Sequence, residues 1–183
     1  MNTLSVKDVD GPIEISFEDL KKYHGTRALC GLTVGYTVLG AAWQSLSDGE
    51  PLDCDDITVE TAFPGPGARD AVEMVTRAVS REAFKVVSDK KPDANIAEAA
   101  KGAYWYRITA KGRAVELGLK QGILPNDFLR LRRKLLAGDG NATEAETFRG
   151  LQKELSSKLL SMDNPLDAFN VLSITDVPMA DVS

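Results

Sequence analysis

The sequence has few of the side chains that most often bind metals, because its 183 residues include one histidine and two cysteines. Zinc normally takes three or four protein ligands, so one histidine and one cysteine six residues apart do not complete a zinc site. The start of the chain has acidic residues where a secretory signal would be basic and then apolar. We therefore expect a cytoplasmic protein whose cysteines are thiols rather than a disulfide.

Basic residues and long apolar runs are also scarce. The 22 lysines and arginines are outnumbered by 27 aspartates and glutamates, which gives a net charge of -5. No nucleic-acid partner is expected, because sequence-independent binding needs a basic patch and the short cluster at 130–134 is interpreted as the solvated face of a helix. The longest apolar stretch, Leu29 to Trp43, is interrupted by glycines and is shorter than the ~20 residues that span a bilayer. No membrane partner is expected either.

Helical and extended patterns alternate along the first two thirds of the sequence, which predicts an α+β fold. Ser16 to Asp19 is a capping-box pattern that begins a short helix, which His24-Gly25 ends. Small and apolar residues almost all round predict a buried helix from Arg27 to Leu46. One mixed sheet is expected, with a parallel crossover between its first two strands and an antiparallel hairpin between its last two. The predicted strands are 57–62, 83–87, 103–109 and 113–119, and the crossover helix is 69–79.

The last third of the sequence has a helical period instead. Helices are predicted at 126–137 and 142–162, followed by an extended segment at 169–177. We expect this helical arm and tail, residues 125–183, to belong to the same folding unit as the core, residues 1–124. Leucines recur at helical spacing in the arm, which predicts a homodimer formed through it.

The candidate site lies where the only histidine comes close in sequence to an arginine and a cysteine. His24 and Cys30 are potential metal ligands, while Arg27 marks a helix start whose free N–H groups favour an anion. In the alternative interpretation, His24 caps a helix and Cys30 is an ordinary buried residue. The Gly31 to Gly35 spacing allows close packing against either a ligand or another backbone.

Several motifs also occur in an order that is typical of a known family. Residues His24 to Gly35 are similar to a signature that runs His-Gly-His-x-Cys-Pro-Gly-x-x-x-Gly. Glu60-Thr61 and Asp70 are similar to a second signature, in which a strand ending in Glu-Thr precedes an Asp that begins a helix; Gly67 stands where that signature has a cysteine. With the aromatic and basic hairpin at 104–115, the chain resembles a divergent member of the FmdE-like family, which takes its name from a component of formylmethanofuran dehydrogenase. The resemblance covers roughly residues 16 to 178.

The resemblance implies a fold, a partner and a function. The implied fold is a helix, a strand, a helix and a three-strand mixed sheet, as in the catalytic domain of glyceraldehyde-3-phosphate dehydrogenases, and the implied partner is a second copy of the chain. The implied site lies near the His-Gly motif and binds zinc or another transition metal through His24 and Cys30. The implied role is accessory to one-carbon or molybdenum and tungsten redox metabolism. The cysteine-rich zinc ribbon of many family members does not occur in this sequence.

An alternative that does not need a metal is a non-catalytic binding module. Helix starts at Arg27 and at Gly67 to Arg69 flank the strand 57–62 and are expected to converge on an anionic cofactor. In a variant of this hypothesis, His24 is the axial ligand of a haem or related tetrapyrrole. The residues expected to contact the small-molecule ligand are Tyr23, His24, Gly25, Arg27, Gly67, Arg69 and Asp70.

Overall fold

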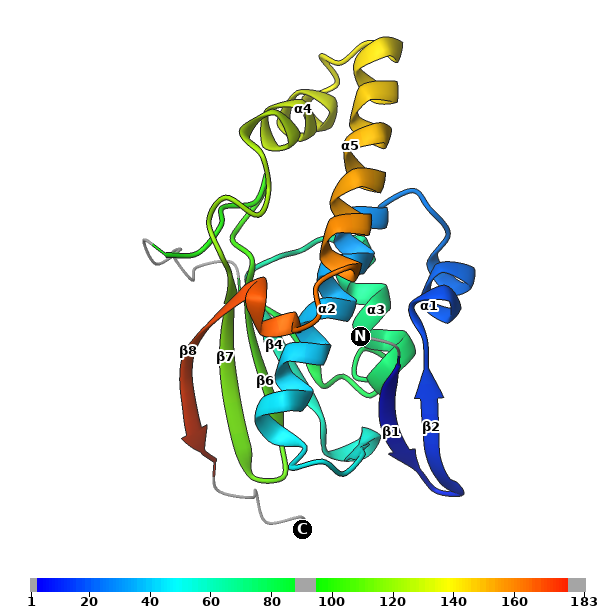
Figure 1. Cartoon of the computed structure of the whole chain (residues 1–183), viewed down its shortest axis with the longest axis vertical. Helices are drawn as coiled ribbons and strands as arrows, with labels where there is room; N and C mark the ends of the chain where they lie inside the picture. The colour runs from blue at the N-terminus through cyan, green and yellow to red at the C-terminus, as the bar shows by residue number, and fades with distance from the viewer. Residues whose placement is uncertain (1–2, 88–94, 178–183) are drawn as a thin grey trace.

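The structure is a computed structural model that describes residues 3–87 and 95–177 (Figure 1). The predicted α+β fold is confirmed, whereas residues 178–183 of the predicted tail unit lie outside the described residues. None of the helices in the described part of the chain is long and apolar enough to cross a membrane. The elements follow one another as β1 (Leu4–Asp8), β2 (Gly11–Ile15), α1 (Phe17–His24), α2 (Leu29–Leu46), β3 (Leu52–Asp53), the 3-10 turn η1 (Cys54–Asp56), β4 (Thr58–Thr61), α3 (Pro66–Thr76), β5 (Phe84–Val86), β6 (Trp105–Ala110), β7 (Arg113–Leu119), α4 (Asn126–Ala137), α5 (Ala142–Leu160), the 3-10 turn η2 (Pro165–Asp167) and β8 (Phe169–Asp176).

The main sheet has five strands in the order β5-β4-β6-β7-β8. β4 and β5 are parallel, and the other neighbouring pairs are antiparallel, so the mixed sheet predicted from the sequence is confirmed. β6 and β7 form the predicted hairpin, with Ala110 opposite Arg113 at its turn. The extended segment predicted at 169–177 supplies the fifth strand, β8.

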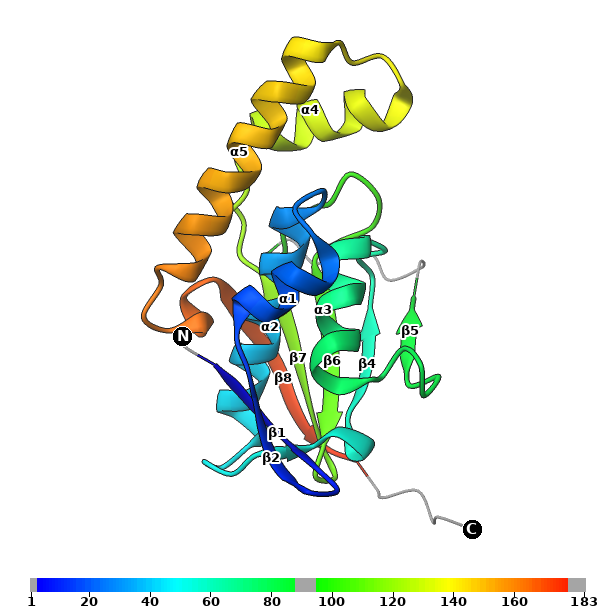
Figure 2. The same cartoon turned by 90° about the vertical axis from the view of Figure 1, so that its right-hand side faces the viewer.

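α2 is the central helix of the fold and packs against β6 and β7 (Figure 2). Nearly all of its residues are buried, as their small and apolar character predicts. α3 lies alongside α2 and contributes to the same hydrophobic core. The two helices begin at Leu29 and Pro66 rather than at the predicted Arg27 and Arg69. For α3 the reason is that Pro66 occupies the first helical position, where a fixed φ is favourable and no N–H is needed.

The first residues of the chain form a second, three-stranded sheet that the sequence patterns do not predict, in the order β2-β1-β3. β1 and β2 are an antiparallel hairpin in which Asp8 lies opposite Gly11. α1 follows with the predicted capping box: Asp19 N–H donates to the Ser16 hydroxyl oxygen, and Ser16 N–H donates to the Asp19 carboxylate. Hydrogen bonds from the Ser16 hydroxyl and N–H lower the pKa of Asp19 to about 2.

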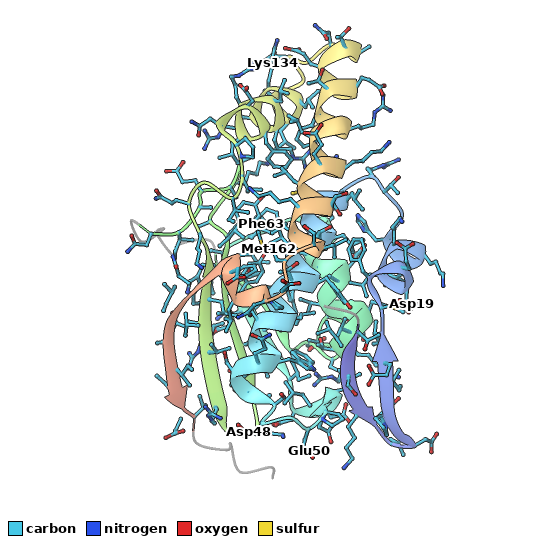
Figure 3. The ribbon with its side chains drawn as sticks, viewed as in Figure 1. Asp19, Asp48, Glu50, Phe63, Lys134 and Met162 are labelled. Carbon is cyan, nitrogen blue, oxygen red and sulfur yellow. The ribbon has the colours of Figure 1, made fainter. Side chains whose placement is uncertain are left out.

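α4 and α5 form an arm that extends away from the main sheet (Figures 1 and 2). α4 has its predicted bounds, and α5 ends at Leu160 rather than Met162. α5 packs along α2, where the hydroxyl oxygens of Thr33 and Ser156 lie 2.6 Å apart. Near the outer end of the arm, Lys134 pairs with Glu144 at 2.6 Å and so joins α4 to α5 (Figure 3).

Candidate functional site

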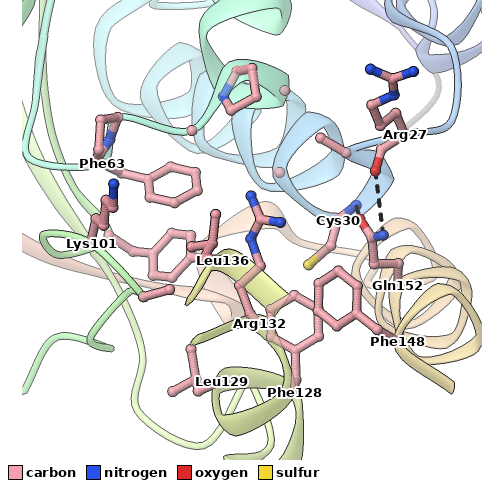
Figure 4. A pocket seen from close by; sticks show the side chains of 18 residues that line it. Arg27, Cys30, Phe63, Lys101, Phe128, Leu129, Arg132, Leu136, Phe148 and Gln152 are labelled. Atoms are coloured by element: carbon pink, nitrogen blue, oxygen red, sulfur yellow. Dashed lines mark hydrogen bonds between the residues drawn. The ribbon is translucent and has the colours of Figure 1, made fainter. Parts of the chain in front are cut away.

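A pocket of about 250 Å³ lies where the starts of α2 and α3 meet the arm (Figure 4). One side of its wall comes from the start of α2, the loop between β4 and α3, and Tyr104 just before β6. The opposite side comes from α4 and α5 of the arm. The helix starts predicted at Arg27 and Gly67 therefore both reach one pocket, whose other half is made by residues about a hundred positions further along the chain.

The starts of α2 and α3 come together because the two helices touch through glycines. A Cβ added to Gly67 would lie 2.6 Å from the Ala28 carbonyl oxygen, and a Cβ added to Gly35 would lie 2.8 Å from the Ala68 Cα. Side chains at these positions would force the helices apart. The Gly31 to Gly35 face therefore packs against the backbone of α3, and Gly31 at its start also lines the pocket.

Both helices begin at the pocket without a side-chain cap. The residues before α2 and α3, Ala28 and Gly65, supply no side-chain acceptor to the first turn, whereas α1 and α5 have capping boxes. Gln152 of α5 supplies one acceptor, because Cys30 N–H donates to its Oε1 at 3.4 Å, and its Nε2 donates to the Arg27 carbonyl at 3.5 Å (Figure 4). The first turn of a helix has N–H groups without intrahelical acceptors and a partial positive charge, so this end of the pocket favours an anion.

The side chains that line the pocket add positive charge to it. Arg27, Lys101 and Arg132 are on its wall, whereas no aspartate or glutamate of residues 3–87 and 95–177 lines it. This is unusual for the chain, whose net charge is -5. The pocket is therefore a local positive region on an acidic protein.

Arg27 and Arg132 differ from the other arginines of the chain in their partners. The others have a carboxylate oxygen at 2.5 to 3.9 Å; they are Arg69, Arg77, Arg81, Arg107, Arg113, Arg130, Arg133 and Arg149. Within the described residues, Arg27 and Arg132 have no carboxylate partner. The guanidinium of Arg132 instead lies 5.9 Å from the ring centroid of Phe148 and points from α4 into the pocket (Figure 4). The arginines without an acidic partner are the ones on the pocket wall.

Aromatic rings make up much of the remaining wall. Phe63 and Tyr104 pack with ring centroids 4.2 Å apart on the core side, and Phe128 and Phe148 stack at 4.9 Å on the arm side. A cationic group that points into the pocket and the aromatic rings around it suit a molecule that has both an acidic group and an apolar body.

Cys30 lies in the pocket wall, and without a metal its buried thiol is protonated at neutral pH. Burial raises the pKa of Cys30 to about 12, and metal ligation requires the thiolate. His24 does not line the pocket, and no group of three or more histidine, cysteine, aspartate or glutamate side chains that could hold a metal occurs in the described part of the chain. Zinc binding by His24 and Cys30 stays a prediction. The described residues offer no group of ligands that would complete such a site.

His24 lies at the end of α1 and contacts α3. Its Nδ1–H donates to the Asp70 carboxylate at 2.7 Å, and its side chain is 8% exposed. Nε2 is buried and has no hydrogen-bond partner in the structure. His24, one of the residues expected to contact the ligand, thus joins α1 to α3 through Asp70 and does not line the pocket. Its role as a haem ligand stays a prediction.

The other residues expected to contact a cofactor fall into two groups. Arg27 and Gly67 line the pocket. Arg69 is exposed and pairs with Asp70 at 3.9 Å. The residues that do not line the pocket are Tyr23, His24, Gly25, Arg69 and Asp70.

The contribution of the arm to the pocket is not among the features predicted from the sequence. The interpretation of the basic cluster 130–134 as a solvated face is right for Arg130 and Arg133, which are exposed, and wrong for Arg132. A sequence signal for this exception exists, because Phe128, Arg132 and Leu136 recur every fourth residue and so share one helix face. All three line the pocket.

The elements implied by the family resemblance are present as α2, β4, α3 and the strands β5 to β7. Their order alone identifies neither a family nor a bound metal, because one fold supports many functions. Membership of the FmdE-like family therefore stays a prediction. A search with protein-family models finds no match to the chain, and a search of curated proteins finds none either.

Proposed function

We propose that this protein is a binding module for a small organic anion, which binds between the starts of α2 and α3 and the arm. The observation that carries the proposal is Arg132 of α4, whose guanidinium points into the pocket and has no carboxylate partner among the described residues (Figure 4). This is the non-catalytic alternative expected from the sequence, with Arg132 of the arm rather than His24 as its central residue.

Electrostatics supports the anion. In a chain with a net charge of -5, most arginines pair with acidic side chains, and leaving Arg132 unpaired at the pocket keeps its hydrogen-bond donors available to a ligand. The uncapped first turns of α2 and α3 add N–H donors and the positive ends of two helix dipoles. An acid group bound here would gain charge-assisted hydrogen bonds from several directions.

Size and wall chemistry support a small organic molecule. An engineered cavity of about 150 Å³ binds benzene, and pockets for drug-sized ligands start at about 300 Å³. The pocket here has a volume of about 250 Å³. Aromatic rings on both sides, Phe63 and Tyr104 opposite Phe128 and Phe148, favour a ligand with an apolar body over an inorganic ion.

Binding of acids and their neutral amides tests the proposal. The full chain is titrated by calorimetry with 2-naphthoate, hexanoate and the two corresponding amides. At least one acid is expected to bind with a Kd below about 1 mM and about tenfold or more tightly than its amide, a difference of about 1.4 kcal/mol. If no acid binds, or if an amide binds as tightly as its acid, the proposal is wrong.

A pair of substitutions on α4 identifies the binding residue. Arg132→Gln removes the charge from the pocket and is expected to weaken acid binding about tenfold or more, a typical effect of losing one charge-assisted hydrogen bond. Arg130→Gln is the matched control, because Arg130 lies on the same helix, is exposed and pairs with Asp127. Equal effects of the two substitutions would contradict a specific role of Arg132.

A further inference from the structure

Two pairs of packed aromatic rings, one tilted and one stacked, lie on opposite sides of the pocket and come from different halves of the molecule. Phe63 and Tyr104, from the core, pack with an angle of 32° between their planes, and Phe128 and Phe148, from the arm, pack at 30°. All four residues line the pocket. Four aliphatic side chains would have given an equally apolar wall, so the aromatic character itself is a feature to explain.

The position of Phe63 depends on the absence of a side chain at the start of α3. A Cβ added to Gly65 would lie 2.3 Å from the Cζ atom of Phe63, so the ring occupies the space that a side chain at Gly65 would take. The ring of Phe63 is thereby held next to the uncapped first turn of α3. An aromatic face and a set of backbone N–H donors are adjacent at this point.

The same pairing of an aromatic face with a cationic group occurs on the arm. Arg132 lies 5.9 Å from the centroid of Phe148, and in Figure 4 its guanidinium lies between Phe63 and Cys30. A guanidinium held by a ring face keeps its in-plane N–H groups for an acid group. An acid group bound to Arg132 would therefore bring whatever is attached to it against the rings.

We infer that the ligand is an aromatic acid: one or two fused flat rings bearing a single carboxylate or phosphate group. This inference rests on the proposed function and adds the chemical class of the ligand to it. The acid group binds Arg132 and the first turns of α2 and α3, and the ring system packs between the two aromatic pairs. The volume of about 250 Å³ has room for such a ligand, since about 150 Å³ suffices for a single benzene ring.

Comparison of an aromatic acid with its saturated counterpart tests the inference. The full chain is titrated with 2-naphthoate, 2-naphthyl phosphate and decahydro-2-naphthoate, which has the same carbon skeleton without a flat ring. 2-Naphthoate is expected to bind about fivefold or more tightly than decahydro-2-naphthoate, which has the same acid group, because ring stacking adds to simple apolar burial. The preference between carboxylate and phosphate identifies the acid group.

The outcomes separate this inference from the proposed function. If decahydro-2-naphthoate binds as tightly as the aromatic acids, the pocket binds organic anions but the aromatic inference is wrong. If no acid binds, the proposed function is wrong, and the inference is wrong with it. Because these comparisons use the unmodified chain, they do not depend on whether any variant folds.

A substitution of Phe63 gives an independent test. Phe63→Leu keeps an apolar wall but removes the ring, so it is expected to reduce the preference for 2-naphthoate over decahydro-2-naphthoate to about twofold or less. Phe17→Leu is the control, because Phe17 packs against Tyr36 and does not line the pocket. A general loss of structure would weaken both ligands equally and leave the preference unchanged, and that result would contradict a stacking role for Phe63.

Discussion

The hydrogen bond between His24 and Asp70 joins the end of α1 to the first half of α3. The bond is 2.7 Å long, and the imidazole that donates it is 8% exposed. A hydrogen bond to a charged group contributes about 1.5 to 3 kcal/mol to stability when it is shielded from water. At the scale of the single residue, the only histidine of the chain is therefore a stabilising contact between helices.

His24→Ala is expected to lower the free energy of unfolding by about 1 to 3 kcal/mol and to leave acid binding unchanged. The loss arises because the Asp70 carboxylate loses its partner, whereas the pocket wall does not include His24. Urea unfolding measures the first effect and calorimetry with 2-naphthoate the second. Asp70→Asn is the matched control, because its amide oxygen still accepts from Nδ1–H and a smaller loss is expected. Loss of acid binding with an unchanged free energy of unfolding would show that His24 belongs to the binding site.

At the scale of secondary-structure elements, glycines determine how closely α2 and α3 pack. Gly31 and Gly35 allow a direct comparison. The nearest atom to a Cβ added at Gly31 lies 3.7 Å away, an ordinary contact, whereas a Cβ at Gly35 meets the Ala71 Cβ at 2.7 Å and the Ala68 Cα at 2.8 Å. Both glycines are within the same helix. α3 leaves no room for a side chain at Gly35, whereas Gly31, which also lines the pocket, has that room.

Gly35→Ala is expected to lower the free energy of unfolding by about 1 to 3 kcal/mol, because overpacking must separate the two helices. Gly31→Ala is expected to leave stability unchanged or to raise it by about 0.5 to 1 kcal/mol, because alanine favours a helix more than glycine does. Urea denaturation of both variants beside the unmodified chain measures the difference. Equal changes in the two variants would show that the close contact between α2 and α3 does not exclude a side chain at position 35.

The elements with strong local signals are the ones that the sequence predicts well. The capping box at Ser16 and the helical period after Asn126 are properties of neighbouring residues, and α1 and α4 occur where they are predicted. The hairpin of β1 and β2 is not predicted, although the dipeptide Asp10-Gly11 is typical of hairpin turns; the two residues between the paired Asp8 and Gly11 are Val9 and Asp10. The sequence predicts only the core side of the pocket. The arm side is formed by residues distant in sequence that pack across the pocket, and no local sequence pattern indicates such a contact.

At the scale of the whole molecule, the arm is the part whose stability depends on what occupies the pocket. α5 packs along α2, but α4 packs mainly on α5, and it faces the core across the pocket. One exposed ion pair, between Arg133 and Glu98 at 3.1 Å, also links α4 to the core. A ligand that fills the pocket would touch both halves and would hold α4 in place.

Binding of 2-naphthoate is expected to slow hydrogen exchange in α4 more than in any element without pocket residues, because ligands stabilise the local structure that they contact. Exchange measured by mass spectrometry with and without the ligand gives the comparison. Peptides from α1 serve as the internal control, since α1 does not line the pocket. A uniform change across the chain, or no change in α4, would contradict a ligand that bridges core and arm.

The homodimer stays a prediction, but the apolar residues that suggest it have neighbours within the chain. Phe128, Leu131, Leu155 and Leu159 of the arm are buried. The large apolar residue of the arm that is highly exposed is Leu136, at 45%, and it lines the pocket. Sedimentation of the full chain at tens of micromolar tests the dimer, and a single monomeric species would make the prediction wrong.

β8 pairs with β7 although the whole arm lies between them in the sequence. During synthesis on the ribosome, β7 therefore emerges long before its outer neighbour and has an unpaired edge, a kind of edge that pairs readily with strands of other chains. Packing of α5 on α2 brings the segment before β8 back towards the sheet, so β8 has less distance to cover before it pairs with β7. Early docking of the arm would thus protect the newly made chain from aggregation until its last strand arrives.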